Sequence, residues 1–276
     1  MNFLFLGDIV GERSVSFIKK NLRKIIEQYS ISFVVANGEN VANGYGIKPF
    51  HCEELWKSGI DVISTGNHVW DQQDIIPFIS KEKKIIRPQN YSDKLPGSGY
   101  NFYVDKCKNN ILVINLACTL FMKKSSSPFQ EIGNILRKNK LKKNCDAIIV
   151  DIHGEAASEK QAFASMIDGK VTAVLGSHTH VPTADLRVLP NGTAFQTDAG
   201  MCGDYNSVIG GEKNTWIAKF TKETSNLKIN SANVNNTLCG SIISICKQSG
   251  LAKRAEQIIV GDILENKIPD KRNFME

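Results

Sequence analysis

The sequence lacks several features that would assign a protein to a specialised class. No apolar run approaches the roughly 20 residues of a membrane-spanning helix, so we expect no membrane partner. The seven cysteines form no CxxC pair, and their odd number argues against a disulfide framework or a zinc knuckle. Reduced thiols and a cytoplasmic location are therefore expected. The apolar start, residues 1–6, has no basic leader and meets Asp8 almost at once, which predicts a first core strand and not a secretion signal.

Charge of one sign is not in large excess. The 34 Lys and Arg against 28 Asp and Glu give a formal charge of +6, a mild bias that favours anionic substrates. The densest basic stretch, residues 137–143, ends a predicted helix and is expected to be a solvated face, with an RNA-binding patch as the alternative. Gly7 and Gly11 are followed by neither a Walker Lys-Ser/Thr nor a GxGxxG pattern, so a nucleotide loop is not indicated.

The remaining composition is that of an ordinary globular protein, with 42% hydrophobic and 22% charged residues. The 276 residues fit a single α/β domain, 1–276. Apolar runs alternate with amphipathic segments in a βαβ pattern. The predicted strands are 2–6, 32–36, 61–64, 110–116, 147–152, 173–176 and a strand-turn-strand run over 188–197, and the predicted helices are 14–28, 50–58, 71–80, 128–140 and 155–167.

From about residue 215 the pattern changes to one typical of antiparallel strands. Segments 216–221, 227–234, 239–247 and 256–260 alternate in this manner, so we expect them to complete a second sheet. Three segments are expected to be long loops that shape a ligand pocket, since ligands of α/β sheets bind at loops after strands. These are 88–90, 96–99 and 200–211.

Four of the five histidines lie in three short motifs, each directly after a predicted strand. The motifs are Gly66-Asn67-His68, Asp151-Ile152-His153-Gly154 and Gly176-Ser177-His178-Thr179-His180. Two earlier strand ends add oxygen donors, Asp8 and the Asn37-Gly38-Glu39-Asn40 element. A mixed set of oxygen and imidazole donors suits divalent manganese, iron, cobalt or zinc. The strand ends therefore predict a metal site.

Each motif also has a structural interpretation. Asp8 suits a turn or a helix cap, the Asn-Gly element suits a plain turn, and His153 could be a satisfied core histidine. The presence of all the motifs together favours a functional interpretation. His178 and His180 occupy alternate positions, so in extended chain they would point the same way and serve neighbouring metals. His68 has a titration range suited to proton transfer. His51 has no matching neighbours and is expected at the surface.

In order and approximate spacing, these five motifs resemble the calcineurin-like metallophosphoesterases. Further segments make the chain more similar to the YmdB-type bacterial 2',3'-cyclic nucleotide phosphodiesterases: Gly7-Asp8-Ile9-Val10-Gly11, Gly66-Asn67-His68-Val69-Trp70-Asp71, Arg87-Pro88-Gln89-Asn90 and Asp151-Ile152-His153-Gly154-Glu155-Ala156. Most superfamily members carry Asp-x-His and Gly-Asp where this chain has Asp8-Ile9-Val10 and Gly38-Glu39. The YmdB-type branch shares both changes, so they favour assignment of the chain to this branch of the superfamily.

The resemblance implies a four-layer α/β/β/α sandwich of two mixed sheets flanked by helices. It also implies two divalent or mixed-valence transition metal ions, iron or manganese, with zinc or cobalt as alternatives. Asp8, Glu39, Asn40 and His180 would hold one ion, and Glu39, Asn67, His153 and His178 would hold the other. A carboxylate between two cations can bridge them, which is the role expected of Glu39. His68 would be a proton donor and not a ligand.

The implied activity is in-line hydrolysis of a phosphodiester, with attack by a metal-bridging hydroxide and His68 as the general acid. The resemblance points to 2',3'-cyclic nucleoside monophosphates as substrates, whereas the residues alone support only a phosphate ester. Asp151 or Asp198 could orient a ligand imidazole from behind, or be structural. The substrate-binding residues are not indicated, and the oligomeric state, including a homo-oligomer, is left open.

Two alternatives remain. A phosphoprotein or small phosphomonoester phosphatase would share the metal chemistry, but His68 is followed by Val69-Trp70 and not by the acidic pattern expected of phosphoprotein phosphatases. A noncatalytic RNA-binding regulatory protein could retain the metal site as a scaffold. The intact His68 argues against that alternative.

Overall fold

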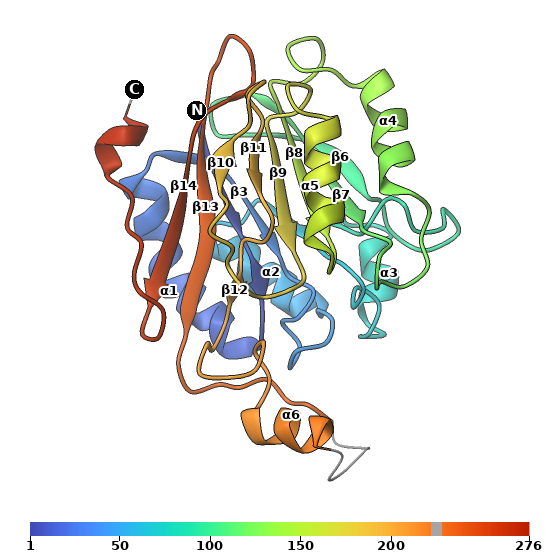
Figure 1. The fold of residues 1–276 in the computed structure, drawn as a ribbon, viewed down its shortest axis with the longest axis vertical. Helices are drawn as coiled ribbons and strands as arrows, with labels where there is room; N and C mark the ends of the chain where they lie inside the picture. Colours follow the sequence, from blue (N-terminus) through green and yellow to red (C-terminus); the bar gives the residue numbers. More distant parts are fainter. Residues whose placement is uncertain (222–227, 276) are drawn as a thin grey trace.

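The structure is a computed structural model that describes residues 1–221 and 228–275. Two six-stranded mixed sheets pack face to face, with helices on their outer faces (Figure 1). The first sheet consists, in order across it, of β14 (Ala252–Gly261), β13 (Thr237–Ile245), β1 (Asn2–Leu6), β3 (Ile31–Asn37), β4 (Val62–Ser64) and β5 (Ile85–Ile86). The second consists of β10 (Arg187–Val188), β11 (Ala194–Gln196), β9 (Ala173–Ser177), β8 (Ala147–His153), β7 (Asn110–Ala117) and β6 (Tyr100–Val104).

The strands of the first sheet other than the edge strand β14 are buried on both faces. Along β1, Leu4 and Leu6 pack against the helices, while Phe3 and Phe5 pack against the second sheet, because successive strand residues point to opposite faces. The helices on the outer face are α1 (Glu12–Gln28), α2 (Pro49–Ser58) and α3 (Ile75–Ile79).

The second sheet is covered in the same way by α4 (Pro128–Lys138) and α5 (Ala157–Met166). Ile132 of α4 and Phe163 of α5 are fully buried against it. Three apolar layers thus separate four layers of secondary structure, and the predicted α/β fold class with two mixed sheets is confirmed. No described helix is both long and apolar enough to cross a membrane.

The prediction for the C-terminal strands was partly wrong. β13 and β14 occur where expected, but they belong to the first sheet and not the second, because β13 pairs antiparallel with β1 from Asn2↔Ser244 to Leu6↔Gly240. An alternating pattern reveals that a strand has two different faces, but it does not name the strand's partner.

The predicted strand 216–221 was also wrong, since these residues belong almost entirely to α6 (Lys213–Phe220). The predicted strand 227–234 begins outside the described residues, and over 228–234 only an isolated bridge between Ser231 and Gly211 is formed. In Figure 1, α6 is the orange helix that lies beyond the ends of the strands. A short parallel pair of β2 (Asp8–Ile9) and β12 (Met201–Cys202) also escaped prediction.

His51 is not at the surface as predicted. It is buried on α2, where its Nδ1 accepts a hydrogen bond from the Lys48 backbone N–H at 3.3 Å and its Nε2 lies 3.3 Å from Glu12 Oε1. Its position at the start of α2 explains the burial, because the side chain caps the first helical turn and fills the space beside α1.

Candidate metal centre and active site

The sequence motifs converge because their strands end at one edge of the two packed sheets. Asp8 follows β1, Glu39 follows β3 and His68 follows β4 in the first sheet. In the second sheet His153 is the last residue of β8 and His178 follows β9, which is parallel to β8. The carboxyl ends of parallel strands are where open α/β sheets place ligands.

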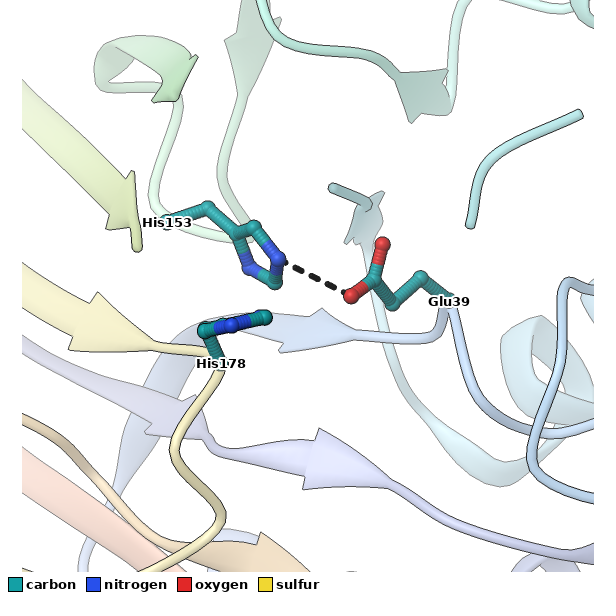
Figure 2. Close-up of side chains that lie close together, drawn as sticks. All are labelled: Glu39, His153 and His178. Carbon is teal, nitrogen blue, oxygen red and sulfur yellow. Dashed lines mark ion pairs between the residues drawn. The ribbon is translucent and has the colours of Figure 1, made fainter. Parts of the chain in front are cut away.

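Glu39, His153 and His178 form the centre of the site (Figure 2). One potential ligand atom of each lies within 4.8 Å of those of the other two. His153 Nε2 is 2.9 Å from Glu39 Oε1 and 3.0 Å from Asn67 Oδ1. The rings of His153 and His178 meet edge to face, with centroids 4.8 Å apart. Two imidazoles, a carboxylate and an amide oxygen therefore share one small volume.

Asp8 and His180 form a neighbouring pair. His180 Nε2 lies 3.7 Å from Asp8 Oδ1, and the other carboxylate oxygen of Asp8 accepts a hydrogen bond from the His178 backbone N–H at 3.0 Å. His180 Nδ1 donates to the backbone carbonyl of Ile209 at 2.8 Å, which leaves the Nε2 lone pair on the side of Asp8. A ligand histidine is commonly held in its tautomer by such a bond to its second nitrogen.

Two buried oxygens of this site, Asp8 Oδ1 and Asn40 Oδ1, have no hydrogen-bond partner among the described residues, and a third, Glu39 Oε1, has only the His153 nitrogen 2.9 Å away. Burial of an unpaired carboxylate or amide oxygen is costly, so nearly all such atoms in folded proteins have a partner. Divalent cations would supply the missing partners. Together with the imidazole nitrogens, these oxygens make a donor set that fits transition metal ions.

The electrostatics of the donor set agree with this interpretation. Burial alone would raise the pKa of Glu39, but the adjacent His153 and His68 outweigh it and lower this pKa to about 2. Burial alone would lower the pKa of His153, but Glu39 and Asp8 raise it to about 9. Burial and the charge of His153 lower the pKa of His178 to about 3. Burial raises the pKa of Asp8 to about 7.

Metal binding should therefore release a proton. A histidine binds a metal ion only as the neutral imidazole. His153, with a pKa of about 9, is protonated at pH 7 in the metal-free protein. We expect the Mn²⁺ affinity to rise by up to about tenfold per pH unit from pH 7 towards pH 9 as this proton is lost. Titration calorimetry in buffers of different ionisation enthalpy measures the proton count, and an affinity that does not change with pH would contradict the expectation.

A buried polar network lies behind His153. Its Nδ1 is 2.9 Å from Ser177 Oγ, which donates to Asp151 Oδ1 at 2.7 Å. Asp151 Oδ2 accepts from Ser64 Oγ at 2.5 Å and from Asn37 Nδ2 at 3.2 Å. Asp151 thus contacts His153 through Ser177 and not directly, and its orienting role stays a prediction.

Asp198 is the other candidate for orienting an imidazole. It accepts a hydrogen bond from the backbone, and none of the described histidine side chains donates to it. Its Oδ2 accepts from the Thr179 backbone N–H at 3.0 Å and from Lys160 Nζ at 3.1 Å. Lys160 Nζ also donates to the Ser177 carbonyl at 2.7 Å, and both charged side chains are 0% exposed. The pair therefore fixes the segment between Ser177 and His180, on which both loop histidines are carried.

Replacement of Lys160 by Met should destabilise the protein by about 3 to 5 kcal/mol, because Asp198 is then left as an unpaired buried charge. The double variant Lys160→Met/Asp198→Asn should recover much of this loss. Urea unfolding of the two variants measures the difference. Equal stabilities of the single and double variants would show that the buried charge is not the cause.

His68 lies beside the metal donors and is paired with Asp71. Its Nδ1 is 2.6 Å from Asp71 Oδ2, and its backbone N–H donates to Glu39 Oε2 at 2.9 Å. The Tyr45 ring meets the imidazole edge to face, with centroids 5.2 Å apart. The His68 side chain is 25% exposed and its Nε2 makes no hydrogen bond to the described part of the chain. This nitrogen is available to a ligand.

A cavity of about 290 Å³ joins these groups. Donor residues and His68 line one part of it: Glu39, Asn40, His68, His178 and His180. The predicted loop 200–211 contributes Ile209, Gly210 and Gly211, whereas Gln89 and Asn90 of the predicted loop 88–90 line a separate hollow.

Some features of the site escaped the sequence analysis. Asp71 was visible in the Gly66–Asp71 motif, and its i+3 spacing from His68 is the signal that could have assigned it as a partner. Nothing in the sequence pointed to Tyr45 or Trp216, which come from segments outside the strand-end motifs. The extended chain assumed for His178 and His180 is not formed: their φ angles are 102° and 65°, so the chain turns sharply after Ser177.

The chain matches the model of the "YmdB-like protein" family over residues 4–258. It is 37% identical over 262 residues to the 2',3'-cyclic-nucleotide 2'-phosphodiesterase of Bacillus subtilis, covering 95% of this chain and 98% of the relative. A crystal structure of a hypothetical protein from Thermus thermophilus superposes with a TM-score of 0.88 at 33% identity, covering 95% of this chain and all of that one. A crystal structure described as that of a novel phosphatase from Mycoplasma pneumoniae also gives a TM-score of 0.88, at 31% identity, covering 100% and 99% of the two chains.

The fold, the strand-end donor set and these relatives together define a hydrolytic phosphoesterase of the metallophosphoesterase class. Within this class the chain belongs to the YmdB-like family.

Proposed function

We propose that the protein hydrolyses 2',3'-cyclic nucleoside monophosphates at two divalent metal ions, with His68 as general acid. The observation that carries this proposal is the pair of buried, unpartnered oxygens of Asp8 and Asn40, which lies with the Glu39 carboxylate and histidine nitrogens beside an available imidazole. The name of the Bacillus subtilis relative supports the substrate class.

In this proposal the donor groups would divide between two ions, with Glu39 as a donor to both. Asp8, Glu39, Asn40 and His180 would hold one ion. Glu39, Asn67, His153 and His178 would hold the other. When bound, the ions supply charge stabilisation for the phosphoryl oxygens and lower the pKa of water, the two effects that phosphate ester hydrolysis needs most.

His68 would donate a proton to the departing ribose oxygen, since an unaided alkoxide is a poor leaving group. The two contacts of His68 suit this role: Asp71 fixes the imidazole through Nδ1, and Glu39 Oε2 holds the backbone N–H of His68. The acid is thereby tied to the same carboxylate that would bridge the two ions.

Asp71→Asn should lower kcat about 10- to 100-fold, because the amide no longer holds the His68 ring in a single orientation and tautomer. Bound metal should be unchanged, since Asp71 contacts His68 and none of the proposed ligands. Steady-state kinetics with elemental analysis test this, with Asp74→Asn as a matched control from the same region. A variant with unchanged kcat would exclude Asp71 as a positioning residue.

A small phosphomonoester phosphatase is the second candidate, favoured by the description of the Mycoplasma pneumoniae relative as a phosphatase. Glu155 favours a diester substrate: its carboxylate lies at the cavity wall, 3.4 Å from His178 Nε2, and is 54% exposed. A carboxylate there repels a dianionic monoester more than a monoanionic cyclic diester.

Parallel assays of Mn²⁺-loaded protein with 2',3'-cyclic AMP, 3'-AMP, an RNA oligomer and a phosphopeptide test the proposal. We expect turnover of the cyclic diester to exceed that of the other three. Faster hydrolysis of 3'-AMP or of the phosphopeptide would favour a phosphatase. Metal-replete protein that is inert on all four would favour the regulatory alternative, which RNA binding would then test.

A further inference from the structure

The cavity has a second, apolar part that the metal chemistry does not use. Trp216 of α6 lines it together with Ile209 and Ile229. These residues lie in segments outside the two sheets, and Trp216 and Ile229 both pack closely around Gly211. This part is continuous with the metal donors, because the carbonyl of Ile209 accepts the hydrogen bond from His180 Nδ1.

α6 contributes nothing to the three apolar layers of the fold. None of its residues, Lys213–Phe220, is buried, and its apolar residues Ile217 and Phe220 are 54% and 74% exposed. This short helix stabilises neither sheet but places an indole in the cavity. We therefore expect its role to be in ligand binding and not in the stability of the fold.

The indole of Trp216 is held in a defined plane. Phe220 stacks on it with ring centroids 5.6 Å apart and an interplanar angle of 19°, and Lys219 Nζ lies 5.1 Å from the ring centre. Gly211 allows the close approach of the indole, because a Cβ at this position would lie 2.4 Å from Trp216 Nε1. A flat apolar surface held in this way is preorganised for another flat ring.

We propose that Trp216, with Ile229 beside it, forms the subsite for the nucleobase of the substrate; this assignment rests on the proposed function. The orientation of the bound substrate follows from the position of His68, the proposed general acid. His68 has to face the leaving ribose oxygen, so the ribose lies near His68 and its neighbour Tyr45. The base then extends away from the metal donors into the apolar part of the cavity.

The subsite predicts broad base tolerance. Stacking on an aromatic ring recognises the face that all bases share, whereas discrimination requires hydrogen bonds to their edges. We therefore expect all four 2',3'-cyclic nucleotides to be substrates, with purines bound more tightly than pyrimidines because their rings are larger.

The test compares Trp216→Ala, Trp216→Phe and the control Ile217→Ala on two diesters that differ only in the base. These are 2',3'-cyclic AMP and methyl riboside 2',3'-cyclic phosphate. Loss of base stacking should raise KM for 2',3'-cyclic AMP about 5- to 150-fold in Trp216→Ala, with kcat within twofold. Trp216→Phe should retain most of the affinity, and the baseless diester should be hydrolysed equally by all four proteins.

Equal losses on both diesters, or no loss on either, would overturn the subsite. Calorimetric binding of 3'-AMP to the Mn²⁺-loaded proteins separates this result from failure of the proposed function, because it needs no turnover. If wild-type protein hydrolyses neither diester, the proposed function fails. The subsite would still be supported if Trp216→Ala bound 3'-AMP more weakly than wild type while the other two variants did not. Equal affinities of wild type and Trp216→Ala would overturn it.

Discussion

Removal of the metal ions is expected to reduce hydrolysis of 2',3'-cyclic AMP by at least about 1,000-fold. The two proposed cations would stabilise the phosphoryl charge by several kcal/mol, and every 1.4 kcal/mol corresponds to a factor of ten. Without them, His153 is paired with Glu39 and His180 with Asp8, so these imidazoles offer little net charge to the phosphate oxygens. Kinetics after dialysis against a chelator, followed by readdition of Mn²⁺ or Fe²⁺, measure this loss and its recovery.

Far-ultraviolet circular dichroism is the control for the chelated protein. Its spectrum should be unchanged, because the apolar layers on both faces of each sheet do not depend on the donor residues. Glu39→Gln should reproduce the loss without a chelator, as a neutral amide cannot offset the repulsion between two cations. Full turnover in the chelated protein would refute a metal-dependent reaction.

Replacement of His68 by Ala is expected to lower kcat about 100- to 10,000-fold, the contribution typical of a positioned general acid. Bound metal should stay at the wild-type level, since the proposed metal donors are other residues. The loss should be much smaller on a p-nitrophenyl diester, because p-nitrophenolate departs without a proton. Steady-state kinetics on both substrates, with elemental analysis of each protein, measure these differences.

His178→Ala provides the matched comparison, because it removes another imidazole of the same cavity. It should lose metal as well as turnover, on both substrates alike. If His68→Ala also loses metal, His68 is a ligand and not an acid. Equal rates for wild type and His68→Ala would remove His68 from the mechanism.

The sequence predicted the parts of the fold that depend on local pattern. The apolar runs that became β1, β3, β8 and β9 were identified, and donors directly after parallel strands were expected to meet. The partner of β13 could not be predicted in the same way, because its pairing with β1 joins residues that are more than 230 positions apart. Pairing of distant strands is decided by the packing of the whole chain.

Two misjudged details of the site have physical reasons. The strand pattern of β9 gave no sign that the backbone turns to positive φ at His178 and His180, a conformation that is uncommon for non-glycine residues and is held here by Asp198 and Lys160. Trp216 was assigned to a strand because its alternating neighbours resemble one. Its helix is only eight residues long and has no buried face, so the Trp216 and Phe220 pair is too short a run of helical spacing to identify it.

The central claim is that Asp8, Glu39, Asn40, Asn67, His153, His178 and His180 surround two cations that share Glu39. Anomalous scattering from a crystal grown with Mn²⁺ tests it most directly. We expect two peaks about 3.5 to 4 Å apart, one on the side of Asp8 and His180 and one on the side of His153 and His178. A single peak, or peaks away from Glu39, would contradict the account.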